Sequence, residues 1–241
     1  MDRDTLDKAI QLYCEDHKIC FHTYGFSSFW NVSNLTDMNS IFKNSKFNGD
    51  ISNWDVSKVI NMEDMFRESE FNQDISKWNV SNVKNMKYMF SMSQFNKDIS
   101  NWDVSSVENM HSMFQQSKFN QDISKWNVSN VEDMSYMFPE TPFNQNISNW
   151  NVTNVKQMNH MFAMTKFNQD ISEWDVSNVE DMTCMFSESK FNQDISNWNV
   201  SNVKWMYNMF YKTKFNQNIS KWYKINLVHN EKYIYDYRSK R

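Results

Sequence analysis

The stretch that decides the fold is residues 71–94, FNQDISKWNVSNVKNMKYMFSMSQ, because the chain repeats it with a strict period of 24 residues. The tryptophans mark this period without an insertion: Trp30, Trp54, Trp78, Trp102, Trp126, Trp150, Trp174, Trp198 and Trp222. We number the positions of the unit from 1 to 24, with Phe71 at position 1. A fixed period of this length indicates one continuous stack of repeats rather than two globular domains.

Apolar residues return at fixed positions of the unit. From Phe47 on, position 1 is always Phe and position 5 is always Ile, while positions 10, 16 and 20 of the complete units are always Val, Met and Phe. Positions 16 and 19 hold 15 of the 18 methionines, which indicates core filler rather than a Met-rich binding surface. No single unit can bury these side chains alone, so stability is expected from contacts between neighbouring coils.

Within one unit the pattern predicts a short strand followed by a short helix. Residues 73–76 place Ile75 between polar neighbours, as in a strand with one buried side chain. Val83, Met86, Met89 and Phe90 then recur at offsets that fit one face of a short α- or 3₁₀-helix. Position 11 is Ser or Thr, which suits an N-cap, and Glu108, Glu132 and Glu180 follow at capping-box spacing.

The two ends of the chain depart from the repeat. Residues 2–16 predict an amphipathic helix with Leu6, Ala9, Ile10 and Tyr13 on one face, interpreted as a cap over the first coil, with a partner-binding helix as the alternative. The expected organisation is an N-terminal helical cap at 1–22, a repeat region at 23–222 and a C-terminal cap or docking tail at 223–241. In that last segment Ile225, Leu227 and Val228 predict a closing strand.

The phrase FNQDISNWxVSNVxxMxxMF resembles the BspA-like leucine-rich-repeat family, whose repeats of this length occur in bacteria, protists and large DNA viruses. The resemblance covers nearly the whole chain. With the coil pattern it implies an α/β fold class: a leucine-rich-repeat-like right-handed solenoid with one short parallel strand and one short helix or 3₁₀ turn per coil. Members are usually described as adhesion or interaction proteins, so the resemblance implies a protein partner.

Composition narrows the classes of function. A net charge of −4 and a pI near 5.7 argue against a general nucleic-acid binder. The sequence has no run of about 18 apolar residues, so no membrane span is expected. The charged N-terminus lacks the apolar region of a signal peptide, and Cys14, Cys20 and Cys184 form no disulfide framework. We therefore expect an intracellular protein in a reducing setting, which includes incorporation into a virus particle.

Catalytic motifs are absent from the sequence. The five histidines share no position of the unit, and no GxSxG, P-loop, HExxH or CxxC pattern occurs. We expect a protein that is not an enzyme and that has neither a cofactor nor a metal site.

The most chemically distinctive position is 4, with Asn146 and Asn218 in two units and aspartate in the others: Asp50, Asp74, Asp98, Asp122, Asp170 and Asp194. If Ile at position 5 faces inward, these carboxylates face outward, and neighbours about 4.8 Å apart repel by roughly 1 kcal/mol even in water. Three interpretations are open. The carboxylates accept hydrogen bonds or meet lysines such as Lys77 and Lys125; they form a surface for a basic protein; or they bind Ca²⁺ between coils.

Two further features are candidates for recognition. Trp205, Tyr207 and Tyr211 form an aromatic patch, either an interface anchor or a seat for the C-terminal tail. Asn at position 2 predicts an inward amide ladder that bonds the backbone of adjacent coils, with a ligand-reading row as the alternative. The sequence thus favours a non-enzymatic scaffold for protein–protein interaction or assembly, with an adhesin-like or cation-dependent binder as the alternative, and it leaves the oligomeric state open.

Overall fold

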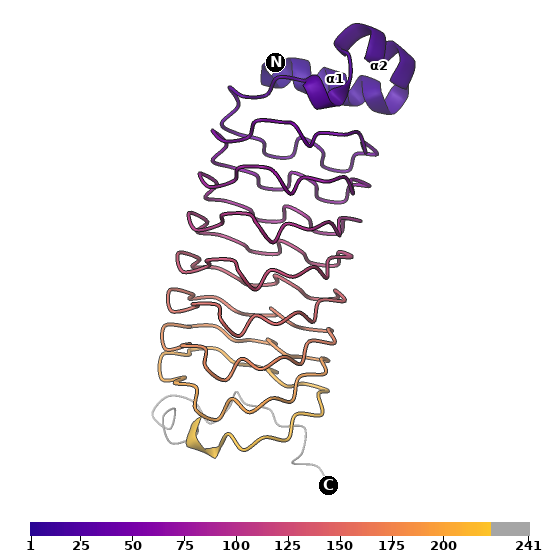
Figure 1. Ribbon diagram of the computed structural model, residues 1–241. Helices are drawn as coiled ribbons and strands as arrows, with labels where there is room; N and C mark the ends of the chain where they lie inside the picture. Colours follow the sequence, from indigo (N-terminus) through magenta and orange to yellow (C-terminus); the bar gives the residue numbers. More distant parts are fainter. Residues whose placement is uncertain (223–241) are drawn as a thin grey trace.

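The computed structural model describes residues 1–222, a column of stacked coils with two α-helices at its N-terminal end and a single helical turn at 220–222 (Figure 1). The helices are α1 (Arg3–Glu15), α2 (His17–Tyr24) and the 3₁₀ helix η1 (Ser27–Phe29). The strand expected at 225–228 and the cap or tail expected at 223–241 lie outside the described residues. No helix in the described part is long and apolar enough to cross a membrane.

Helix α1 forms where the apolar spacing predicts it. The carboxylate of Asp2 caps its start by accepting a hydrogen bond from the backbone N–H of Thr5 at 2.9 Å. Leu6, Ala9 and Ile10 are buried in the same cluster as the first coils. Helix α2 was not predicted, because among its eight residues only Cys20 is buried and no apolar stripe marks it.

The core of the column is a set of parallel rows of identical side chains. The Phe66 ring lies 4.4 Å from that of Phe71 and 5.4 Å from that of Phe90, and the Trp54 and Trp78 rings are 6.3 Å apart. The methionines of positions 16 and 19 are at most 5% exposed, so their assignment as core filler is confirmed. Each coil therefore packs chiefly on the next.

Backbone pairing between coils lies in the second half of the unit. The N–H groups of positions 16, 18, 20 and 22 donate to the carbonyls of positions 15, 17, 19 and 21 in the following coil. In one coil these bonds run from Met86 to Asn109, Tyr88 to His111, Phe90 to Met113 and Met92 to Gln115, at 2.7–3.0 Å. Isolated parallel bridges join position 15 of successive coils, from Asp37–Asn61 to Asp181–Trp205.

The predicted strand at 73–76 is wrong. The described residues contain no strand, and this segment turns instead, because the Ser76 N–H donates to the Asp74 carboxylate at 2.8 Å. Ile75 does face inward and is fully buried. The alternation of polar and apolar residues therefore correctly predicted which side chain is buried, but not the backbone conformation.

The predicted helix in the second half of the unit is also wrong. Tyr88 and Met92 have positive φ of 57° and 56°, and the Met89 N–H bonds the Met86 carbonyl three residues back, as in a turn. Within residues 1–222, all sixteen non-glycine residues with positive φ occupy position 18 or 22, and none of them is β-branched. An α/β description therefore does not fit the coils, since the described helices lie at residues 3–29, apart from one helical turn at 220–222.

The expected helix caps serve other purposes. The Ser81 N–H donates to the Asn79 amide oxygen at 3.1 Å, a turn that recurs at positions 9 and 11 along the chain. The three glutamates at capping-box spacing instead pair with lysines of neighbouring coils: Lys84–Glu108 at 3.0 Å, Lys156–Glu132 at 2.7 Å and Lys204–Glu180 at 2.7 Å.

Candidate functional site

The aspartate row at position 4 holds turns together. In each of its coils one carboxylate oxygen accepts the backbone N–H of the serine two residues later, at 2.8–2.9 Å: Asp50, Asp74, Asp98, Asp122, Asp170 and Asp194. This backbone bond, helped by the serine hydroxyl, lowers the pKa of Asp74, Asp122 and Asp194 below its usual value. The hydrogen-bond interpretation of this row is confirmed.

Asn146 and Asn218 make the same bond as the aspartates, at 2.9 and 3.0 Å, so the turn needs the side-chain oxygen and not the charge. Within the described residues, no group of three or more His, Cys, Asp or Glu side chains is placed to hold a metal ion. The second carboxylate oxygen of each aspartate leaves an acidic, exposed row along one side of the column.

The asparagine row at position 2 bonds backbone as expected. The Asn48 amide oxygen accepts the Asn72 N–H at 2.9 Å, and the same bond recurs in each following coil. These side chains are half-buried or exposed rather than inward, because the amide oxygen reaches the next coil from the outside. The row therefore has a structural use.

The three aromatic residues near the last described coil are unequally exposed. Trp205 is 44% exposed, whereas Tyr207 and Tyr211 are half-buried. The Lys212 ammonium lies 5.0 Å from the centre of the Tyr211 ring. Since the proposed tail lies outside the described residues, both interpretations of this patch stay predictions.

Side-chain diversity is concentrated on one face of the column. Positions 17, 18 and 21 change in size and charge from coil to coil, although the core positions hardly vary. Position 17, for example, holds Asn39, Glu63, Lys87, His111, Ser135, Asn159, Thr183 and Tyr207. We call positions 15, 17, 18, 21 and 22 the variable face. Sequence reasoning missed it, although the changing positions of the repeat were its signal.

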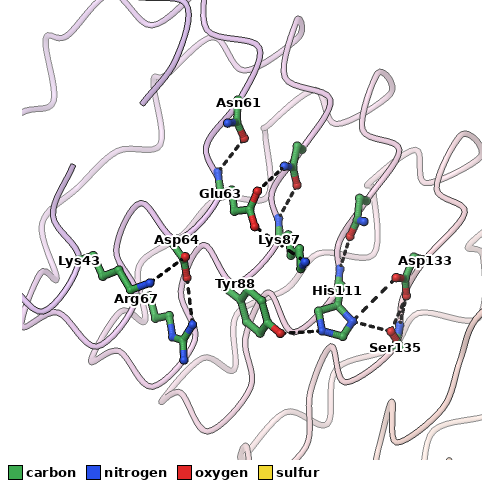
Figure 2. A network of polar contacts seen from close by, with 12 residues as sticks. Lys43, Asn61, Glu63, Asp64, Arg67, Lys87, Tyr88, His111, Asp133 and Ser135 are labelled. Atoms are coloured by element: carbon green, nitrogen blue, oxygen red, sulfur yellow. Dashed lines mark hydrogen bonds and ion pairs between the residues drawn. The ribbon is translucent and has the colours of Figure 1, made fainter. Parts of the chain in front are cut away.

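Contacts across coils show that these positions share a surface. Figure 2 shows Lys43 and Arg67 at either side of the Asp64 carboxylate, at 2.9 and 3.3 Å. The Arg67 guanidinium also lies 4.9 Å from the centre of the Tyr88 ring. Lys87 extends the network to Glu63 at 3.8 Å. In this N-terminal half of the variable face, acidic and basic groups therefore neutralise one another.

The network continues through His111 at the middle of the face. Its Nε2 lies 3.0 Å from the Tyr88 hydroxyl and its Nδ1 lies 2.6 Å from the Ser135 hydroxyl (Figure 2). Burial lowers the pKa of His111 below 6.5, although the nearby Asp133 opposes the effect. The imidazole therefore lies between two hydroxyl groups, where burial favours its neutral form.

Ser135, His111 and Asp133 contain the residue types of a hydrolase triad but not its arrangement. In a triad the aspartate accepts a hydrogen bond from the histidine nitrogen that points away from the serine. Here Asp133 accepts a hydrogen bond from the Ser135 hydroxyl itself. The His111 nitrogen that points away from the serine faces Tyr88, and Ser135 is only 4% exposed. The cluster lacks the geometry by which an aspartate orients a histidine base toward an accessible serine.

Beyond His111 the face carries a stack of two rings. Tyr136 and His160 lie with ring centres 4.3 Å apart at an interplanar angle of 9°. His160 Nδ1 is enclosed and has no hydrogen-bond partner among the described residues, and burial lowers the pKa of His160 below 6.5. Burial likewise raises the pKa of Tyr136, helped by negative charge at Asp181.

Comparison with known proteins gives a family. A model described as "Mycoplasma protein of unknown function, DUF285" matches residues 22–118, 85–165 and 141–240. No curated protein and no solved structure matches the chain. The three overlapping matches span nearly all of the sequence, as expected for tandem repeats. The chain therefore belongs to the family of Mycoplasma proteins of unknown function, DUF285.

Proposed function

We propose that this protein is a non-enzymatic scaffold that binds another protein through the surface of its coils. The observation that carries the proposal is the variable face: side chains differ from coil to coil there, while the core stays nearly constant. A repeat needs no such diversity to stack, but recognition of a partner does. The family description assigns no activity that competes with this function.

The finer form of the proposal is a BspA-like, leucine-rich-repeat-like right-handed solenoid that serves in assembly, for instance in a virus particle. The uninterrupted register of eight tryptophan intervals supports a long, regular binding surface of this kind. The arrangement of Ser135, His111 and Asp133 supports a role other than hydrolysis, because the serine is buried and the triad geometry is missing.

Affinity purification of the chain from its native source, followed by mass spectrometry, tests this function. We expect one dominant structural protein at a near-equal amount. A chain that captures no protein at all, at physiological salt and without crosslinking, refutes the scaffold function.

Addition of Ca²⁺ distinguishes the scaffold from the alternative, a cation-dependent binder. A thermal stabilisation by Ca²⁺ that disappears in the Asp98→Ala, Asp122→Ala variant would replace the scaffold with that alternative. Unchanged melting temperature with Ca²⁺ or with chelator is the expected result, because each aspartate already serves a backbone turn.

A further inference from the structure

The C-terminal part of the variable face differs in charge from the N-terminal part. In residues 37–68 the basic side chains Lys43 and Arg67 pair with acidic neighbours. In residues 133–140, 157–164 and 181–188, which fill positions 15–22 of the next three coils after His111, the charged groups are Asp133, Glu140, Asp181 and Glu188, with neither lysine nor arginine.

Three of these four carboxylates have no lysine or arginine within ion-pair distance among the described residues. Asp133 faces the His111 ring at 3.8 Å and Asp181 accepts the Thr183 N–H at 2.8 Å. Glu140 accepts a hydrogen bond from the side-chain amide of Gln116 at 2.9 Å. In the part of the chain that the structure describes, Glu188 alone of the four meets a lysine, Lys212 at 3.4 Å. This part of the face is therefore uncompensated negative charge around an aromatic stack.

The chain itself shows which group such a surface accepts. Arg67, at position 21, lies over the Tyr88 ring of the following coil and pairs with Asp64 and Glu68, at 3.3 Å each. The corresponding residue before Tyr136 is Gln115, and the one before His160 is Pro139. The place that a guanidinium fills over Tyr88 thus has no cationic side chain over Tyr136, whose ring neighbours are His160 at 4.3 Å on one side and the edge-on His111 ring at 5.8 Å.

We propose that Tyr136 and His160, with Asp133, Glu140 and Asp181 around them, form a docking site for an arginine-bearing segment of a protein partner. The inference rests on the proposed scaffold function and names the face and the partner's chemistry. A guanidinium can stack on the ring of Tyr136 while it donates hydrogen bonds to the flanking carboxylates, which an ammonium group does less well. Asp133 and Asp181 are partly buried, so their charges are less screened by salt than those of an open surface.

The repeat supplies substitutions that leave the coils intact. Position 15 carries Asn in other coils, where Asn61, Asn85 and Asn109 make the turn bond that Asp133 and Asp181 make. Position 22 carries Gln116. The variant Asp133→Asn, Glu140→Gln, Asp181→Asn therefore removes three charges with little change of shape.

A matched control removes three charges from position 4, which is not part of the variable face. Asp74→Asn, Asp98→Asn, Asp122→Asn changes the net charge equally, and Asn146 and Asn218 show that asparagine supports the position 4 turn. A further variant, Tyr136→Ser, removes the ring at a position where Ser40 and Ser112 adopt the same positive φ.

The experiment measures binding of a fluorescent peptide of alternating arginine and serine by anisotropy, with the matching lysine peptide as a second probe. We expect the variable-face variant and Tyr136→Ser each to weaken arginine-peptide binding by about tenfold, and the position 4 control by less than about twofold. The arginine peptide should bind more tightly than the lysine peptide. Equal weakening by the two triple variants, or none by either, overturns the docking site.

Capture of the native partner separates this inference from the function on which it rests. A protein captured equally by the wild-type chain and by the variable-face variant leaves the scaffold function standing and overturns the docking site. Site-specific peptide binding with no captured protein leaves the docking site standing and overturns the scaffold function.

Discussion

The indole N–H of Trp126 donates a hydrogen bond to the backbone carbonyl of Ile99, 27 residues earlier, at 3.1 Å. The same carbonyl accepts the backbone N–H of Trp102 at 3.1 Å. One buried oxygen thus closes the turn of its own coil and fastens the next coil to it. The bond recurs down the column, from Trp54 to Trp198.

The first prediction concerns this bond. Trp126→Phe removes the donor and part of a buried ring, so we expect the free energy of unfolding to fall by about 2 kcal/mol. Urea denaturation followed by far-UV circular dichroism measures the change. Trp205→Asn, at an exposed side chain that other coils replace with asparagine, is the control and should change stability by less than about 0.5 kcal/mol. If the free energy of unfolding falls no more for Trp126→Phe than for Trp205→Asn, the buried indole hydrogen bond does not stabilise the stack.

The second prediction concerns backbone conformation. Met164 is half exposed and has φ of 55°, a left-handed value that costs a side-chain-bearing residue energy. Met164→Gly should stabilise the protein by about 0.5–1 kcal/mol, and Met164→Val should destabilise it by about 1–2 kcal/mol. The exposed Lys166 is not among the positive-φ residues, so Lys166→Gly should not stabilise. Stabilisation by Val at 164 would show that the left-handed conformation is not what limits this position.

The third prediction concerns pH. Burial lowers the folded-state pKa of His111 and His160 below 6.5, so the unfolded chain binds protons first as the pH falls. Stability should therefore decrease from about pH 7 downward through 6.5 and level off below the folded-state pKa. Lys87, Glu63, Asp133 and Asp181 act on these rings but do not reverse the effect of burial.

The variant His111→Asn, His160→Ser tests it, because other coils carry asparagine and serine at these positions. Its free energy of unfolding should change less with pH than that of the wild type between pH 5 and 7, about the titration range of histidine. Parallel pH curves for the two proteins would mean that other groups cause the dependence.

The fourth prediction concerns register. Deletion of residues 119–142 removes one complete coil and brings Phe143 to the place of Phe119, with identical core positions on both sides of the junction. The shortened chain should fold with the same circular dichroism shape and a modestly lower urea midpoint. Deletion of residues 119–130 alone places polar residues in core rows, so cooperative unfolding should be lost. If the half-coil deletion is tolerated as well as the full one, stacking does not depend on the 24-residue register.

One part of the candidate site could be predicted from the sequence and another could not. The position 4 aspartates were identifiable from sequence because they repeat, and their exposure follows from the inward Ile75 and its equivalents. The changing positions of the repeat marked the variable face, but its contacts could not be derived from sequence, because Tyr88, His111 and Ser135 belong to three different coils. Only the stacking of coils brings side chains that are separated by 23 or 24 residues in the sequence into hydrogen-bonding distance.

The sequence by itself determined the period, the buried rows, the use of methionine as core filler and the position of α1, because burial follows from which side chains are apolar at each step of the repeat. Tertiary structure alone decided how the backbone runs between those side chains. Spacings of three and four residues suit both a helix and consecutive turns, and the choice depends on where the backbone N–H groups find acceptors. In Met86–Met92 the N–H groups of alternate residues reach carbonyls of the next coil, so turns with left-handed residues replace the helix.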